Sequence, residues 1–170
     1  MRGYFGIGIY HNKSKRNIGT LWRSAQLFDA SFVFTIQMRY KWQPSDTLKT
    51  WRTVPFFHYE EMDDFTHHIP YECDLIGVEL TDDATDIVEF KHPRRCIYLL
   101  GAEDTGLPPE ILAMCKKVIK LPGKHSMNVS TAGSIVLYDR YIKDSKNPYF
   151  QKWDVHKGDT LKNNCFDPEK

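Results

Sequence analysis

Short runs of apolar residues recur along the chain between polar stretches, and their lengths predict strands. The run from Tyr4 to Tyr10 is the first, and the run over 31–38 is rich in the aromatic and β-branched residues that strands favour. Two later runs, 75–80 and 96–100, are apolar without interruption, which is typical of parallel strands buried on both faces. The predicted strands are 4–10, 31–38, 54–59, 75–80, 96–100 and 118–121.

Helical patterns lie between these runs. Leu21, Ala25 and Phe28 recur at helical spacing and predict an amphipathic helix over 18–30, after a basic loop over 11–17. The other predicted helices are an acidic surface helix over 60–68, a short helix over 108–115 with proline in its first turn, and a long helix, capped by Asn128 or Ser130, that ends near residue 142. Strands that alternate with helices predict an α/β fold with a mostly parallel sheet and helices on both faces.

Length and composition indicate one globular domain. The chain has 170 residues, and we expect an α/β domain over 1–143 followed by a polar, partly disordered tail over 144–170. No apolar run approaches the roughly 18 residues of a membrane helix, and the first ten residues lack the apolar region of a secretory signal. The cysteines are scattered without a C-x-x-C pair: Cys73, Cys96, Cys115 and Cys165. We therefore expect free thiols and a cytoplasmic protein.

Charge is distributed unevenly, although the formal net charge is only +1. Residues 1–52 hold nine Lys/Arg and two Asp/Glu, 53–90 hold eleven Asp/Glu and no Lys/Arg, and 91–170 hold fourteen Lys/Arg and nine Asp/Glu. A polyanion could bind the first and third segments and would be repelled by the second. The distribution is equally compatible with solvated charged faces, so charge alone does not identify a partner.

Three loops at predicted strand or helix ends carry glycine and short polar residues, where open α/β sheets bind ligands. They cover 17–23, 100–108 and 121–130. Gly101 and Gly106 would let the backbone approach a ligand closely or adopt positive φ. Taken singly, a glycine turn is more often a chain reversal, and Asn128 is more often only a helix cap. The three loops become informative only in combination.

In this order the loops resemble the three motifs of the SpoU/TrmH family of trefoil-knotted (SPOUT) RNA 2′-O-methyltransferases. The matching patterns are N-x-G-x-x-x-R from Asn17, L-G-A-E-x-x-G-L-P from Leu100, and L-P-x-x-x-S-M-N-V-S from Leu121. The resemblance covers about residues 4–143. It is closest to the minimal members, which lack an N-terminal RNA-binding extension.

This resemblance implies a sheet whose C-terminal part threads a deep trefoil knot, a rare feature in proteins. It implies that the knot loops bind S-adenosyl-L-methionine, with S-adenosyl-L-homocysteine as product and no metal. The residues implied to contact the donor are Leu80, Gly101, Leu121, Ser126 and Met127. A homodimer is also implied, with the helix that starts near Val129 at the two-fold interface and each active site shared. On that helix, Ile135, Val136 and Tyr138 would form the apolar face.

The implied reaction is in-line transfer of a methyl group to a ribose 2′-hydroxyl, so the protein must align the hydroxyl and help it lose its proton. Such alignment can contribute roughly 7–11 kcal/mol in favourable cases. Arg23 is implied to activate the hydroxyl. Because a guanidinium holds its proton too firmly to act as a base, we expect Arg23 to grip the adjacent phosphate and stabilise developing negative charge. Asn17 would orient the ribose, and Glu103 and Asn128 would shape the substrate pocket.

RNA is the implied substrate. Many minimal members act on transfer RNA, and ribosomal RNA is the alternative. We expect the RNA to be held by Lys13, Lys15, Arg16 and Arg23. A second basic segment with two tryptophans could contribute charge and base stacking: Arg39, Lys41, Trp42, Lys49, Trp51 and Arg52. A non-catalytic RNA-binding member of the same fold is a further alternative, against which the presence of Asn17, Arg23 and Glu103 argues.

Other functional classes receive little support. The pattern Gly6-Ile7-Gly8 is half of a dinucleotide fingerprint, but no third glycine follows and it lies inside a predicted strand. His58, His67 and His68 lie near Cys73 without the spacing of a metal site. No G-x-S-x-G motif is present, which leaves a serine hydrolase without support.

Overall fold

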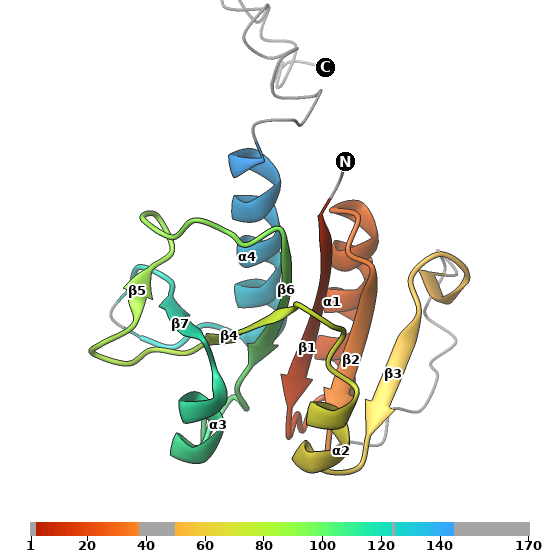
Figure 1. Cartoon of the computed structure of the whole chain (residues 1–170), viewed down its shortest axis with the longest axis horizontal. Coiled ribbons are helices and arrows are strands. Elements are labelled where there is room, and N and C mark those ends of the chain that lie inside the picture. Colours follow the sequence, from red (N-terminus) through yellow and green to blue (C-terminus); the bar gives the residue numbers. More distant parts are fainter. Residues whose placement is uncertain (1–2, 38–49, 124, 145–170) are drawn as a thin grey trace, which may run out of the picture.

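The computed structural model describes residues 3–37, 50–123 and 125–144, which form a seven-stranded sheet flanked by helices (Figure 1). In chain order the elements are β1 (Tyr4–Tyr10), α1 (Lys15–Leu27), β2 (Phe32–Ile36), the 3-10 turn η1 (Thr50–Arg52), β3 (Phe56–Tyr59), α2 (Met62–His67), β4 (Asp74–Val78), β5 (Thr85–Asp86), β6 (Arg95–Leu100), α3 (Pro109–Met114), β7 (Lys117–Lys120) and α4 (Val129–Lys143). The strand order is β3-β2-β1-β6-β4-β7-β5, and the strands pair in parallel. The predicted α/β class with a mostly parallel sheet is confirmed.

The predicted start of the first helix was wrong, and one strand was not predicted. The first helix begins at Lys15, so Asn17 lies in a helical turn and not in the preceding loop. The helix can start early because the side chain of Asn12 forms a local turn with Ser14, accepting from its backbone N–H at 3.1 Å and donating to its carbonyl at 2.8 Å. The two-residue strand β5 was not predicted, since Thr85–Asp86 is polar and too short to show a pattern.

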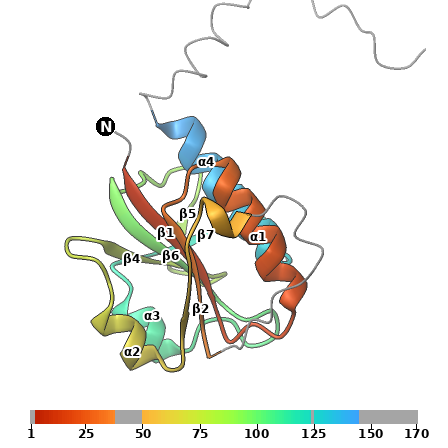
Figure 2. The same ribbon diagram turned by 90° about the vertical axis from the view of Figure 1, so that its right-hand side faces the viewer.

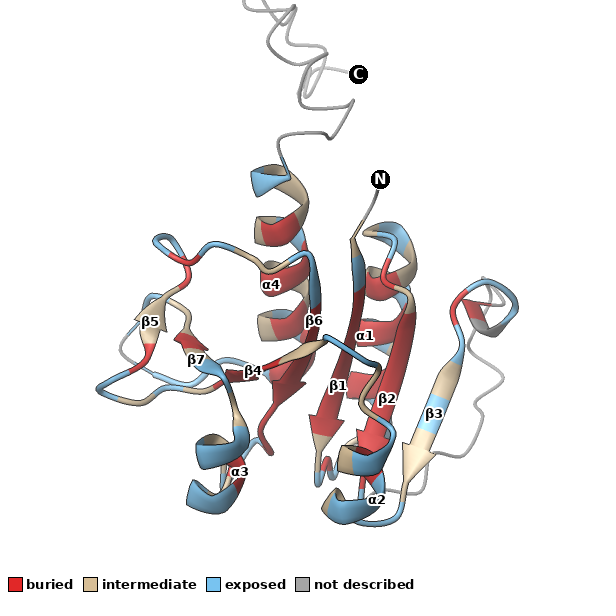
Figure 3. Cartoon of the chain, viewed as in Figure 1, coloured by how far each residue is buried: buried red, intermediate tan, exposed pale blue. Residues whose placement is uncertain are grey.

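The sheet is covered on both faces, as expected. Helices α1 and α4 lie side by side on one face, while α2 and α3 lie on the other (Figure 2). Alternate residues of β6 serve the two faces: Tyr98 and Leu100 pack toward α1 and α4, and Ile97 and Leu99 toward α2 and α3. The central strands are buried along most of their length (Figure 3), and each fully buried apolar side chain contributes roughly 1.5–3 kcal/mol.

The glycines of the Gly6-Ile7-Gly8 pattern make room for aromatic rings of the neighbouring strand. A Cβ atom on Gly6 would lie 2.3 Å from Cζ of Phe32, and one on Gly8 would lie 2.5 Å from Cδ2 of Phe34. Both contacts are far inside van der Waals distance. Core packing therefore explains this pattern without a bound nucleotide.

The strand order brings distant loops together. β6 lies between β1 and β4, and β7 lies between β4 and β5, so neighbours in the sheet are not neighbours in the chain. Because the strands are parallel, the loops that follow β1, β4, β6 and β7 all leave from the same edge of the sheet. The trefoil knot stays a prediction.

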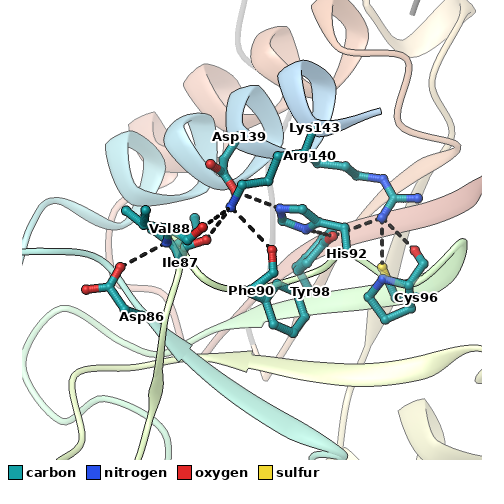
Figure 4. Close-up of polar contacts among 11 residues, drawn as sticks. Asp86, Ile87, Val88, Phe90, His92, Cys96, Tyr98, Asp139, Arg140 and Lys143 are labelled. Atoms are coloured by element: carbon teal, nitrogen blue, oxygen red, sulfur yellow. Dashed lines mark hydrogen bonds and ion pairs between the residues drawn. The ribbon is translucent and has the colours of Figure 1, made fainter. Parts of the chain in front are cut away.

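A polar cluster fastens the C-terminal half of α4 to the segment that precedes β6 (Figure 4). The side chain of His92 is only 4% exposed; its Nε2 lies 2.8 Å from Oδ2 of Asp139, and its Nδ1 lies 2.6 Å from the hydroxyl of Tyr98. Arg140 donates to the same hydroxyl at 3.1 Å, and Lys143 pairs with Asp139 at 2.8 Å. Burial lowers the pKa of His92, although the neighbouring Asp139 opposes the shift.

Several predicted features fall outside the described residues: Arg39, Lys41, Trp42, Lys49, Cys165 and the tail after Asp144. Cys73, Cys96 and Cys115 are free thiols. None of the helices within residues 3–37, 50–123 and 125–144 has the length and apolar character needed to cross a membrane.

Candidate active site

A cleft lies at the carboxyl edge of the sheet, among the loops that follow β4, β6 and β7. The five residues predicted to contact a donor all line it: Leu80, Gly101, Leu121, Ser126 and Met127. Leu80 and Met127 expose 47% and 44% of their surface, so the cleft presents apolar side chains that nothing in the described chain covers. Such a lining suits a ligand with a flat apolar part, held by loop backbone.

Three of the four predicted catalytic residues form one hydrogen-bonded cluster, which shares Glu103 with this cleft. Nδ2 of Asn17 and Nδ2 of Asn128 each donate to Oε1 of Glu103 at 2.9 Å. Nδ2 of Asn128 also donates to Oδ1 of Asn17 at 3.1 Å. The cluster therefore joins one residue from each of the three motifs.

Asn128 caps α4 as well as joining the cluster. Its Oδ1 accepts from the backbone N–H groups of Ser130 at 3.1 Å and Thr131 at 3.3 Å, while its Nδ2 faces Asn17 and Glu103. The sequence left open whether Asn128 is only a helix cap or belongs to the site. In the structure its side-chain oxygen caps α4 and its side-chain nitrogen joins the cluster. The start of α4 is thereby held to the hydrogen-bonded cluster of Asn17, Glu103 and Asn128.

Asn12 is a site residue that sequence reasoning missed. It is only 5% exposed, and its Oδ1 lies 3.4 Å from Nδ2 of Asn17. Because its side chain also forms the turn with Ser14, it holds the start of α1 in the position that brings Asn17 to Glu103. The signal available in the sequence was an asparagine two residues before a serine in a loop, which favours this kind of turn.

Glu79 is a second residue that was missed, and it changes the interpretation of two glycines. Its carboxylate accepts from the backbone N–H of Leu80 at 3.0 Å and of Leu107 at 2.8 Å. A Cβ atom on Gly101 or Gly106 would lie 2.5 or 2.6 Å from Oε2 of Glu79. Gly106 has the expected positive φ, at 63°, and a Cβ there would meet this carboxylate, whereas a Cβ on Gly101 would also lie 2.5 Å from the backbone of Gly106. The signal was an acidic residue inside the apolar run 75–80.

The basic residues predicted to bind RNA lie at and after the loop before α1. The Lys13 ammonium contacts the Asp104 carboxylate, and this hydrogen bond holds the pKa of Asp104 below its ordinary value. Lys15, Arg16 and Arg23 are exposed on α1, a helix without an acidic residue. Lys13 is thus already paired, whereas the helix presents its positive charges to solvent.

Arg23 is the one predicted catalytic residue that the structure does not bring to the cluster. It lies six residues after Asn17, which is about 9 Å further along the helix axis. Within the described parts of the chain its guanidinium makes no hydrogen bond or ion pair, and its side chain is exposed. In the same residues no three His, Cys, Asp or Glu side chains are grouped so that they could hold a metal ion.

Comparison with known proteins gives a consistent set of relatives. The sequence pattern of the "SpoU rRNA Methylase family" matches residues 5–138. The tRNA (guanosine(18)-2′-O)-methyltransferase of Escherichia coli K12 is 34% identical over 68 residues, which are 38% of this chain and 30% of that protein. The mouse tRNA (guanosine(18)-2′-O)-methyltransferase TARBP1 is 19% identical over 140 residues, 72% of this chain and 8% of that protein. The chain therefore matches less than a third of the length of either relative.

Solved structures share the fold. An AdoMet-bound rRNA methyltransferase from Sinorhizobium meliloti superposes with a TM-score of 0.73 at 18% identity, over 82% of this chain and 56% of that one. A structure described as "Structural insights into the 2-OH methylation of C/U34 on tRNA" gives a TM-score of 0.73 at 20% identity, over 84% of this chain and 97% of that one. At these identities the similarity shows a common fold.

Proposed function

Since the chain belongs to the SpoU rRNA Methylase family, we propose that it transfers a methyl group from S-adenosylmethionine to a ribose 2′-hydroxyl of transfer RNA. The observation that carries the proposal is the cluster of Asn17, Glu103 and Asn128 beside the cleft. Chance would rarely place one residue of each motif within hydrogen-bond distance of the others. Relatives named as tRNA 2′-O-methyltransferases favour transfer RNA over ribosomal RNA.

The cleft suits this donor. Leu80, Leu121 and Met127 offer apolar surface to a purine ring, and the loops that follow β6 and β7 offer backbone groups to its polar edge. When bound, S-adenosylmethionine supplies the methyl group on a positively charged sulfur, which leaves as a neutral thioether. The chain therefore has no departing anion to stabilise, and its residues act on the hydroxyl.

The hydrogen-bonded cluster of Asn17, Glu103 and Asn128 would position the ribose. Asn17 is 6% exposed and its amide is held by Glu103 and Asn128, so it has little rotational freedom. A fixed amide can orient a hydroxyl without giving up or accepting a full charge. Negative charge develops on the oxygen as the hydroxyl proton is lost to water, and the new C–O bond forms as the bond between sulfur and the methyl group breaks; Arg23 would stabilise that charge and bind the neighbouring phosphate.

We place the RNA along the exposed face of α1. Arg16, Thr20 and Arg23 lie on one exposed side of the helix, at spacings of four and three residues. The two guanidinium groups are separated by about two turns and can each grip a phosphate. The acidic segment 53–90 would repel the RNA from its own part of the surface, which favours binding to basic regions such as this helix.

We also propose that the protein acts as a homodimer through α4. Val136 does not belong to the proposed interface, because it is fully buried against the sheet. Tyr138 is 53% exposed, however, and Leu27 on the adjoining α1 is 71% exposed, so the paired helices present apolar surface. The first turn of α4 lies next to the cleft, since α4 begins two residues after Met127, so a partner subunit that covered the whole length of the helix would reach the cleft. It could then receive Arg23, which does not reach the cluster of its own chain.

The decisive experiment incubates the protein with methyl-labelled S-adenosylmethionine and separate pools of transfer and ribosomal RNA. We expect label in transfer RNA, at one nucleotide that resists alkaline cleavage because its 2′-hydroxyl is blocked. Label on a base would overturn the proposed chemistry, and label confined to ribosomal RNA would overturn the proposed substrate. Donor binding with no label in any RNA pool would instead favour a non-catalytic RNA-binding protein of this fold.

A further inference from the structure

The carboxylate of Glu79 occupies an unusual position in the cleft. It lies between Gly101 and Gly106, and both its oxygens accept backbone N–H groups, from Leu80 and Leu107. The two glycines leave no side chain between this carboxylate and the loop that follows β6. A side chain at either glycine would clash with this carboxylate, so glycine at both positions allows the carboxylate to lie in the wall of the cleft.

Among the residues that the structure describes, no cation pairs with this carboxylate. In residues 3–37, 50–123 and 125–144, neither Glu79 nor the other acidic lining residue, Glu103, takes part in an ion pair. The nearby Lys13 is already paired with Asp104. Peptide and amide N–H groups carry no net charge, so their hydrogen bonds do not cancel the charge of the two carboxylates. These two carboxylates give the described lining of the cleft a negative charge, which favours a cationic ligand.

We propose that Glu79 supplies the counter-charge by which the cleft prefers the methyl donor to the demethylated product. This inference rests on the proposed function. S-adenosylmethionine carries a sulfonium, an ammonium and a carboxylate, so its net charge is +1; loss of the methyl group leaves a neutral sulfur and a net charge of zero. The two molecules have nearly the same shape, and charge is the property by which a protein can distinguish them.

The short distance between Glu79 and a bound ligand makes the effect substantial. A ligand that contacts Leu80 and Gly101 lies within a few ångströms of Glu79, because Glu79 precedes the first in the chain and touches the second. At such separations a charge pair in a partly desolvated site changes affinity by about tenfold or more. Transfer of the methyl group would itself remove this attraction, which favours product release.

The test compares three ligands by calorimetry: S-adenosylmethionine, S-adenosylhomocysteine, and sinefungin, in which an amine-bearing carbon replaces the methylated sulfur. We expect the wild-type protein to bind the two cationic ligands more tightly than the neutral one. Glu79→Gln should reduce that preference about tenfold while changing the affinity for S-adenosylhomocysteine much less. Glu110→Gln, an equal charge change on the exposed first turn of α3, should leave the preference unchanged.

Using a ratio of affinities separates charge from structural damage. Glu79→Gln also disturbs the two backbone hydrogen bonds, which would weaken all three ligands alike. Glu79→Asp keeps the charge and should keep the preference even if every affinity falls. An unchanged ratio in Glu79→Gln would overturn the inference and leave the donor site intact. If none of the three ligands bound the wild-type protein, the proposed function itself would fail.

Discussion

Nδ2 of Asn128 donates to Oδ1 of Asn17 at 3.1 Å, which joins side chains that lie 111 residues apart in the chain. The bond connects the first turn of α1 to the residue that caps α4, and the two helices pack against each other along the same face of the sheet. A shift of the first turn of α4 would therefore displace the side chain of Asn17. The site is held by the same contacts that hold the helix pair.

The double role of Asn128 can be separated by substitution. Asn128→Ser keeps an oxygen that can cap α4, so we expect the free energy of unfolding to change by less than about 0.5 kcal/mol. Asn128→Ala removes the cap and should cost about 1 kcal/mol. Both variants lose the amide that donates to Asn17 and Glu103, so both should lose most turnover. Urea unfolding and methyl transfer would be measured on the same samples. If Asn128→Ser kept its activity, Asn128 would act only as a helix cap.

Two glycines of the motifs should respond in opposite ways to alanine. Gly101→Ala would force a Cβ atom to 2.5 Å from Glu79 and the backbone of Gly106, which should cost roughly 1–3 kcal/mol of stability and weaken donor binding. Gly19 lies within α1, and a Cβ atom added there would meet nothing within 4 Å, so Gly19→Ala should stabilise the protein by roughly 0.5–1 kcal/mol. Thermal unfolding of the pair gives the comparison. Equal shifts of the same sign would contradict the proposed packing.

Most of the fold could be predicted from the apolar patterns, because buried strands and amphipathic helices each leave a pattern in a short stretch of sequence. They did not reveal β5, whose two residues pair with β7 only through tertiary context. At the site, motif residues could be named from the sequence because loops at strand ends are where such folds bind ligands. Asn12 and Glu79 could not, since their roles arise from contacts with Asn17 and with Leu107, which the chain brings close only on folding.

Stability should depend on pH through His92. Burial lowers the pKa of this imidazole in the folded state below its ordinary value of 6.5, so the unfolded chain binds the proton more tightly. The contribution is therefore fully present above about pH 6.5 and is lost as the pH falls below that value. The neutral ring also fits its neighbours: one nitrogen can donate to Asp139 while the other accepts from Tyr98. Urea unfolding at pH 7.5 and pH 5.5 would measure the loss.

A matched histidine provides the control for this titration. His92→Gln should lower stability at both pH values and reduce the difference between them, because the buried titrating group is gone. His68→Gln replaces an exposed histidine directly after α2 and should leave the difference as in the wild type. If His92→Gln kept the full pH dependence, other groups would have to account for it.

Association should depend on Tyr138. Tyr138→Glu places a charge in the middle of the exposed apolar surface of α4, so we expect the mass measured by light scattering to fall from dimer to monomer at micromolar concentration. Turnover should fall with it if the site is shared between subunits. Tyr71→Glu, at a side chain that is 82% exposed on the loop before β4, is the control and should stay dimeric. A wild-type protein that is monomeric and active would rule out the shared site.

Arg23 gives the sharpest division between chemistry and binding. It lies about 9 Å along α1 from Asn17 and outside the hydrogen-bonded cluster, so Arg23→Ala should leave donor affinity nearly unchanged. Turnover should nevertheless fall by roughly 10²-fold or more, the scale expected when a charge-stabilising group is removed from a transition state. Arg23→Lys should restore little of it, because an ammonium lacks the planar pair of donors that grips a phosphate.

Arg16→Ala is the matched control for Arg23, since it removes the same charge from the same exposed face of α1. It should raise the RNA concentration needed for half-maximal rate and leave the rate at saturating RNA close to that of the wild type, because a phosphate contact away from the reacting hydroxyl contributes to binding only. Single-turnover rates at saturating RNA would distinguish the two arginines. Equal rates for Arg23→Ala and Arg16→Ala would mean that Arg23 only binds RNA, and that the hydroxyl is activated by Asn17 and its neighbours without help from a cation.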